Sequence, residues 1–202
     1  MPPRLVIFDM DDVLCRYDLG SRLRALSRIS GKTPRDIRAA IWDSGFEDDS
    51  DAGGYPDPDI YLKEFGRRLG HPITATEWIA ARRVAMSPYP EVLDLARRIG
   101  SKARLAIYTN NGPLLKLHIG EIFPEVAAVF AELYCSYEFA TKKPDPNSFL
   151  RLLKALGAAP EDSWFIDDKR SNVQGARMAG LIGHHFRSFQ PLADDAHGLG
   201  LI

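Results

Sequence analysis

Four short, mostly apolar runs, each of which ends abruptly at polar residues, constrain the fold of this chain more than any other feature. The runs occupy residues 5–8, 104–108, 132–135 and 163–166. Because the apolar residues in them do not alternate with polar ones, each run predicts a strand that is buried on both faces, as in a parallel sheet. The third run is the weakest of the four.

Amphipathic helical segments lie between these runs. Apolar side chains recur at helical spacing in residues 92–99, 149–156 and 173–180. Strands that alternate with helices predict right-handed βαβ units, since parallel neighbours need a crossover connection. We therefore expect an α/β fold with a Rossmann-like, three-layer core built on a parallel sheet.

The segment after the first run has a different character. Residues 16–87 contain no clear strand and show four helical patterns. One pattern begins at Thr33, which a proline follows, and another at the capping-box spacing of Thr74 and Glu77. The composition of residues 45–56 predicts a loop. The expected domains are a core, residues 1–15 and 88–202, and an inserted helical cap, residues 16–87.

Composition excludes several classes of protein. Lys and Arg number 26 against 27 Asp and Glu, so the net charge of −1 gives no overall attraction to nucleic acid or an anionic membrane. No apolar run approaches the roughly 20 residues that span a bilayer, and the N-terminus lacks the features of a signal peptide. Cys15 and Cys135 do not make a disulfide framework. We expect a cytoplasmic monomer or homodimer whose partner is a small molecule, and a loose tail at residues 194–200.

Acidic residues follow the first run directly, at Asp9, Asp11 and Asp12. Three carboxylates this close together repel one another, and a buried cluster of this kind needs a cation. Carboxylate and backbone oxygens suit Mg²⁺. Solvated acidic turns have the same composition, so the cluster alone leaves both interpretations open.

Three further polar segments occupy residues 109–112, 142–146 and 167–172. Each by itself is explained as well by a local role such as a helix cap, a basic turn or an acidic helix start. Together with the first acidic cluster they predict one shared site, because the carboxyl ends of parallel strands meet at one edge of a sheet. Carboxylates for a metal, beside a hydroxyl, amides and a lysine for an anion, match what phosphoryl transfer from a phosphate ester requires.

The order of these segments resembles the motifs of the haloacid dehalogenase (HAD)-like hydrolase superfamily. The matching stretches are residues 8–14, 108–110, 143–146 and 165–168, with Asn172. The resemblance covers nearly the whole chain and implies a phosphatase-type member that uses Mg²⁺ and hydrolyses a small phosphorylated metabolite. The first motif of the family usually has Gly where this chain has Asp12, a difference that concerns the local turn and not the chemistry.

The resemblance also implies a role for each matching residue. Asp9 would be the nucleophile that forms an aspartyl-phosphate. Asp11 would protonate the leaving oxygen and then deprotonate the hydrolytic water. Thr109 and the amide of Asn110 would hold phosphate oxygens, and Lys143 would neutralise charge.

A Mg²⁺ site is part of the same resemblance. Its ligands would be the carboxylate of Asp9, the backbone carbonyl of Asp11 and the carboxylate of Asp168, with Asp167 beside them. Residues 16–87 are similar to the first-type helical cap of the family, which excludes water and selects the substrate.

The sequence of the expected cap gives weaker indications of the substrate than the four motifs give of the reaction. Residues 42–47 are similar to the cap of sugar-phosphate phosphatases, such as glucose-1-phosphate phosphatases. The acidic residues 47–51 are interpreted either as a solvated loop or as partners of sugar hydroxyls. Arg16 follows the acidic cluster directly and is a candidate substrate-binding residue, although a surface role is equally open.

Three other functions remain as alternatives. A 2-haloacid dehalogenase uses the same nucleophile on a carbon centre, but Asp11 would then have no leaving oxygen to protonate. A sugar-phosphate mutase would return the phosphoryl group to a substrate oxygen. A non-catalytic metabolite-binding protein would have no need for the intact set of acid, hydroxyl and lysine.

Overall fold

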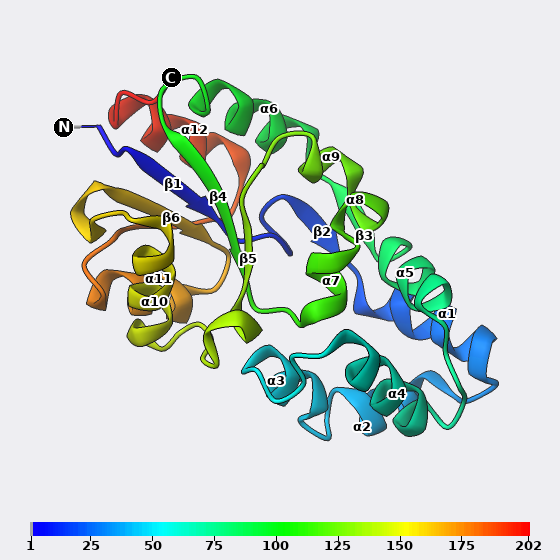
Figure 1. Ribbon diagram of the computed structural model, residues 1–202. Helices are drawn as coiled ribbons and strands as arrows, with labels where there is room; N and C mark the ends of the chain where they lie inside the picture. Colours follow the sequence, from blue (N-terminus) through cyan, green and yellow to red (C-terminus); the bar gives the residue numbers. More distant parts are fainter. Residues whose placement is uncertain (1) are drawn as a thin grey trace.

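A parallel sheet lies at the centre of the computed structural model, which describes residues 2–202 (Figure 1). Its five strands run in the order β5-β4-β1-β6-β7. The strands are β1 (Leu5–Phe8), β4 (Arg104–Thr109), β5 (Leu133–Cys135), β6 (Ser163–Asp167) and β7 (Ile182–His185). The α/β fold predicted from the apolar runs is confirmed.

The central position of β1 decides which residues meet at the edge of the sheet. Phe8, the last residue of β1, pairs with Ile107 of β4 on one side and with Ile166 of β6 on the other. The polar residues that follow these three strands are therefore neighbours, as the parallel arrangement predicts.

Helices cover both faces of the sheet (Figure 1). Leu5 and Ile7 pack in one buried cluster with residues of α10 and α11, whereas Val6 and Phe8 pack in another with residues of α6 and α12. The helices of the core are α6 (Pro90–Ile99), α7 (Pro113–Leu117), α8 (Ile119–Ile122), α9 (Pro124–Ala127), α10 (Pro146–Leu156), α11 (Arg170–Met178) and α12 (Phe189–Gly198). Because neighbouring β1 side chains point to opposite faces, its continuous apolar run serves both layers.

A second group of helices lies beyond the carboxyl edge of the sheet (Figure 1). They are α1 (Leu19–Ser30), α2 (Pro34–Ile41), α3 (Phe46–Asp51), α4 (Pro58–Leu69) and α5 (Ala75–Arg83). Two of their starts agree with the sequence signals. Thr33 accepts a hydrogen bond from the backbone N–H of Asp36, and Thr74 forms a capping box with Glu77. We call these helices the cap, and their boundaries as a separate domain remain a prediction.

A short antiparallel ribbon corrects the expectation that residues 16–87 hold no strand. It pairs β2 (Cys15–Tyr17) with β3 (Met86–Pro88), where the chain leaves the core for the cap and returns. Three paired residues are too few to show a strand pattern in the sequence. The ribbon forms because the two ends of the cap segment lie side by side.

Helix α3 corrects the predicted loop at residues 45–56. Glu47, Asp48 and Asp49 lie in its first turn, where the helix dipole favours acidic side chains. Phe46 anchors the helix, since its ring is buried and stacks on Tyr61 with 5.4 Å between the ring centroids. The acidic composition that suggested a loop is thus the composition of a helix start.

Helix α12 corrects the predicted loose tail at residues 194–200. Leu192, Ala196 and Leu201 are fully buried in the cluster that covers one face of the sheet. The first two are one helical turn apart, which gives the segment an apolar side despite its acidic and glycine residues. Within residues 2–202, no helix combines the length and the apolar character needed to cross a bilayer.

Gly175 allows α11 to approach the loop that carries Lys143. A Cβ atom at this position would lie 1.9 Å from the carbonyl oxygen of Pro144. We predict that Gly175→Ala lowers the free energy of unfolding by about 1–3 kcal/mol, because either the helix or the loop must shift. Urea unfolding measures the effect, and Gly120→Ala is the control, since no atom lies within 4 Å of its added Cβ. Equal stability of the two variants would contradict the packing.

Asp51, the last residue of α3, makes stability depend on pH. Burial, with Glu47 nearby, raises the pKa of this half-buried carboxyl well above its ordinary value, although Lys142 opposes the shift. The folded state therefore holds the proton more tightly than the unfolded chain. The contribution of Asp51 to stability is then complete below about pH 4 and is lost as the pH rises through the pKa in the folded state.

We therefore predict that Asp51→Asn is more stable than the parent at pH 8 and that this advantage disappears near pH 4. Urea unfolding of both proteins between pH 4 and pH 8 tests this expectation. If the two stability curves ran parallel across that range, the carboxyl would not be the titrating group.

Candidate active site

The polar ends of three central strands line one cavity. Asp9 follows β1, Thr109 ends β4, and Asp168 follows β6, and all three border a cavity of about 330 Å³. Asp9 and Thr109 are only 6% and 1% exposed, so they face this enclosed space and not bulk water. Asp11, Asn110 and Lys143 also line the cavity. The structure brings together residues that lie up to 159 positions apart in the chain.

Lys143 lies between two carboxylates. Its Nζ is 2.8 Å from Oδ1 of Asp9 and 2.7 Å from Oδ2 of Asp167, and it also donates to the carbonyl oxygen of Tyr108. Burial acts to lower the pKa of Lys143, but Asp167 and Asp9 outweigh this effect and raise the pKa above its ordinary value. Lys143 therefore remains a fixed positive charge beside Asp9.

Asp167 and Asp168 differ in what they contact. Asp167 is fully buried and does not line the cavity. Its oxygens accept hydrogen bonds from the side chains of Asn172 and Lys143 and from the backbone N–H of Lys169. Asp168 faces the cavity, and its Oδ1 is buried without a hydrogen-bond partner among residues 2–202. The geometry thus favours Asp168 over Asp167 as the metal ligand, and Asp167 as the residue that orients Lys143.

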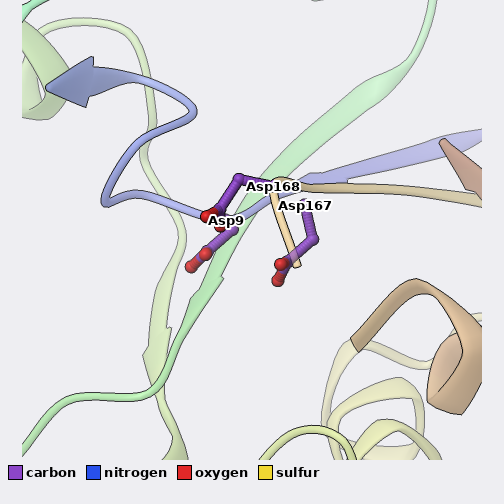
Figure 2. A group of neighbouring side chains, drawn as sticks. All are labelled: Asp9, Asp167 and Asp168. Atoms are coloured by element: carbon purple, nitrogen blue, oxygen red, sulfur yellow. The ribbon is translucent and has the colours of Figure 1, made fainter. Parts of the chain in front are cut away.

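Three carboxylates converge at this edge of the sheet. Asp9, Asp167 and Asp168 each offer one oxygen, and these oxygens lie within 4.8 Å of one another (Figure 2). Burial raises the pKa of Asp9 to about 8, with Lys143 opposing and Asp167 adding to the shift, and burial also raises the pKa of Asp168. A divalent cation would relieve both the desolvation and the repulsion, so the donor set fits a hard metal ion.

The turn after Asp9 accommodates an aspartate where the resembled family has glycine. Asp12 has a φ of +62°, in the left-handed region that Asp tolerates better than most residues. Its Oδ1 accepts a hydrogen bond from the backbone N–H of Tyr17, and its own N–H donates to the carbonyl of Cys15. These bonds hold the turn, so the substitution leaves Asp11 at the cavity.

The side-chain amides after Thr109 serve the loops around them. Asn110 donates to the carbonyl oxygen of Lys143 and accepts from the N–H of the same residue, with distances of 2.9 and 3.0 Å. Asn111 donates to the hydroxyl oxygen of Thr109. The side chain of Asn110 therefore fixes the position of Lys143, and its backbone amide is the donor that would serve a phosphate oxygen.

The cap contributes Arg82, which sequence reasoning missed. This side chain of α5 is 3% exposed, and its Nη2 lies 2.9 and 2.6 Å from the two carboxylate oxygens of Asp11. Its guanidinium also lies over the ring of Tyr17. The signal that could have revealed Arg82 is its i,i+4 spacing from Trp78, which places both on the buried side of α5.

Other cap residues complete the wall of the cavity, namely Tyr17, Arg22, Trp42, Glu47, Asp48 and Asp51. Three of the four acidic residues of α3 thus line the cavity, whereas the sequence had left open whether they are solvated or face a substrate. Arg16, the predicted substrate-binding residue, does not line it and is exposed. The reason is strand alternation, because consecutive residues of β2 point to opposite sides and Tyr17 takes the inner one.

Comparison with known proteins shows which family has a similar sequence. The chain matches the model of haloacid dehalogenase-like hydrolases over residues 3–180. It is 29% identical over 195 residues to a phosphoglycolate phosphatase of Pseudomonas putida, covering 89% of this chain and 67% of that protein. It is 35% identical over 77 residues to flavin mononucleotide hydrolase 1 of Arabidopsis thaliana, covering 38% of this chain and 31% of that protein, about a third of its length.

A solved structure shows the same fold. The structure of this chain aligns with that of a HAD family enzyme of Bacteroides thetaiotaomicron, which was crystallised in complex with magnesium and inorganic phosphate. The TM-score is 0.78 at 20% sequence identity, over 94% of this chain and 98% of that one. The family match covers four of the five strands of the sheet, the cap and all four polar segments. The chain therefore belongs to the haloacid dehalogenase-like hydrolases.

Proposed function

We propose that this protein is a Mg²⁺-dependent phosphatase that hydrolyses a small phosphate monoester through an aspartyl-phosphate on Asp9. The observation that carries the proposal is the contact of 2.8 Å between Asp9 Oδ1 and Lys143 Nζ inside the cavity that Thr109 and Asp168 also line. A dianionic phosphate would be repelled by a lone carboxylate. A buried ammonium at hydrogen-bond distance from the nucleophile offsets that repulsion.

In the first step, a carboxylate oxygen of Asp9 attacks phosphorus and the bond between phosphorus and the ester oxygen breaks. The leaving oxygen takes a proton from Asp11, so that an alcohol departs and the phosphoryl group stays on Asp9. Thr109 and Lys143 hold the phosphoryl oxygens in place during the transfer.

In the second step, water attacks the phosphorus of the aspartyl-phosphate. Asp11, now a carboxylate, accepts the proton from this water, and the bond between phosphorus and Asp9 breaks to release inorganic phosphate. Arg82 contacts both oxygens of Asp11 and so holds this side chain at the cavity.

The residues present fit a Mg²⁺ ion. Asp9 and Asp168 would supply carboxylate oxygens and Asp11 its backbone carbonyl, and the unpartnered, buried Oδ1 of Asp168 is the observation that supports this set. When bound, the ion would neutralise charge on the phosphate and lower the pKa of Asp9. The relative from B. thetaiotaomicron, whose structure holds magnesium and phosphate, supports the assignment.

The cavity limits the substrate to a small molecule. A volume of about 330 Å³ lies at the lower end of ligand-site volumes, and cap side chains form its outer wall. The relatives named phosphoglycolate phosphatase and flavin mononucleotide hydrolase support phosphate esters as the substrate class.

We predict that Asp9→Asn lowers phosphate release at least about 1,000-fold, because an amide cannot accept the phosphoryl group. Phosphate release from a panel of small phosphate esters with Mg²⁺ measures the loss, and circular dichroism shows whether the fold is kept. The control is Asp162→Asn, a partly buried partner of Arg4 that lies before β6 and outside the cavity wall, and this variant should retain parental rates. A folded Asp9→Asn protein with parental turnover would exclude the mechanism.

Metal removal separates this function from its alternatives. We expect EDTA to abolish phosphate release and added Mg²⁺ to restore it. A dehalogenase would release halide from 2-haloacids in the presence of EDTA, and a mutase would yield an isomeric phosphate ester instead of inorganic phosphate. Either outcome would replace the proposed reaction.

A further inference from the structure

One cationic side chain in the wall of the cavity has no role in the reaction described above. Arg22 of α1 is 2% exposed, and its guanidinium lies among aromatic rings of the cap. The guanidinium carbon is 4.8 Å from the ring centroid of Trp78, 5.2 Å from that of Trp42 and 5.9 Å from that of Phe65. These rings restrict the plane of the guanidinium, so that its N–H groups point in fixed directions.

Two of the three guanidinium nitrogens lack an acceptor. Nη1 donates to the hydroxyl of Tyr17 at 3.2 Å, whereas Nε and Nη2 are buried and meet no hydrogen-bond partner in residues 2–202. Arg22 also forms no ion pair within that part of the chain, although every guanidinium at neutral pH is charged. A buried charge with unused donors is costly to the folded state unless a ligand pairs with it.

The acidic residues that share the cavity are engaged in other ways. Glu47 accepts a hydrogen bond of 2.6 Å from the hydroxyl of Tyr61, and Asp48 pairs with Lys142. Burial raises the pKa of Asp51, which favours its neutral form. Burial acts to lower the pKa of Arg22, but Tyr17 and Glu47 outweigh this effect and raise the pKa above its ordinary value. None of the three carboxyls is ion-paired with the guanidinium, however, so its two free nitrogens still lack an acceptor.

The free nitrogens define the shape of the missing partner. The Nε–H and one N–H of Nη2 lie on the same edge of a guanidinium and run parallel, which matches the two oxygens of a carboxylate. Hydroxyl groups would satisfy one donor each but would leave the buried charge unbalanced. The wall that Arg22 contributes belongs to the same cavity as Asp9, Thr109 and Lys143, where the phosphate would lie.

We propose that Arg22 binds a carboxylate of the substrate, so that this phosphatase selects small phosphate esters of hydroxy acids over neutral phosphate esters of similar size. The proposal rests on the proposed function, since it places a phosphate at Asp9. The phosphate and the carboxylate would occupy the core side and the cap side of one cavity of about 330 Å³, which suits a molecule of a few carbon atoms.

A matched pair of esters tests the proposal. 3-Phosphoglycerate and glycerol 3-phosphate differ in having a carboxylate or a hydroxymethyl group at the end opposite the phosphate. We expect kcat/KM of the Mg²⁺-loaded parent to favour 3-phosphoglycerate by about 10–150-fold, since a hydrogen bond to a charged group contributes about 1.5–3 kcal/mol. In Arg22→Met this ratio should fall to about one, mainly through a higher KM for the carboxylate ester.

Two further variants separate recognition from folding. Arg24→Met changes an exposed arginine of the same helix, which pairs with Asp18, and should keep the parental ratio. Arg22→Lys keeps the charge but loses the parallel N–H pair, so it should give a ratio between those of the parent and Arg22→Met. Equal ratios for the parent and Arg22→Met would overturn the proposal.

Binding without turnover provides a readout that does not depend on activity. We expect 3-phosphonopropionate to raise the thermal unfolding midpoint of the Mg²⁺-loaded parent more than 3-hydroxypropylphosphonate does, and Arg22→Lys to reduce the difference. Hydrolysis of both esters without any carboxylate preference would reject the role of Arg22 and leave the phosphatase intact. Absence of phosphate release from every ester tried would reject the proposed function itself, and this inference with it.

Discussion

The ion pairs of Lys143 hold the candidate site together. A lysine that is 2% exposed needs compensation for its lost hydration, and Asp167 and Asp9 provide it on two sides. The two carboxylates are not equivalent. Asp167 is fully buried and saturated with hydrogen bonds from Asn172 and the start of α11, so it is a permanent partner, whereas Asp9 faces the cavity. The arrangement holds the ammonium beside Asp9, so it would also lie close to the oxygens of a phosphoryl group attached to that residue.

The fold supplies this geometry through the order of its strands. With β1 between β4 and β6, the residues just after three strands must share one edge, and no loop has to fold in a special way to bring Asp9 near Asp168. The loop that carries Lys143 does need help. Asn110 bonds its backbone on one side, and the close approach of α11 at Gly175 supports it on the other. The strands thus position the acidic residues, and local packing positions Lys143.

The same distinction explains what could be predicted from the sequence. Strands, and the polar residues that end them, follow from local patterns, because burial on both faces leaves a continuous apolar run and the chain must turn polar where it emerges. Asp9 and Thr109 were found in this way. Arg22 and Arg82 were not. Each lies on the buried side of its helix, but the sequence does not show that this side reaches the cavity. Their burial depends on how the cap packs, which involves residues far apart in the chain. Arg16 was predicted to bind substrate because it follows the acidic cluster in the sequence. The prediction failed because side chains alternate along β2, and Tyr17 instead of Arg16 lines the cavity.

The two buried arginines also show how the cap and the core divide their work. The residues that would contact the phosphoryl group, Asp9, Thr109 and Lys143, all come from the core, where Asp9 and Lys143 are ion-paired. The cap would reach the reaction through Arg82, which within residues 2–202 is ion-paired with the general acid candidate Asp11 alone. The second buried arginine of the cap, Arg22, has two guanidinium nitrogens without an acceptor in residues 2–202. Since a buried cation is costly while its donors stay unpaired, the core would carry the chemistry of phosphoryl transfer, and the cap would contact the rest of the substrate.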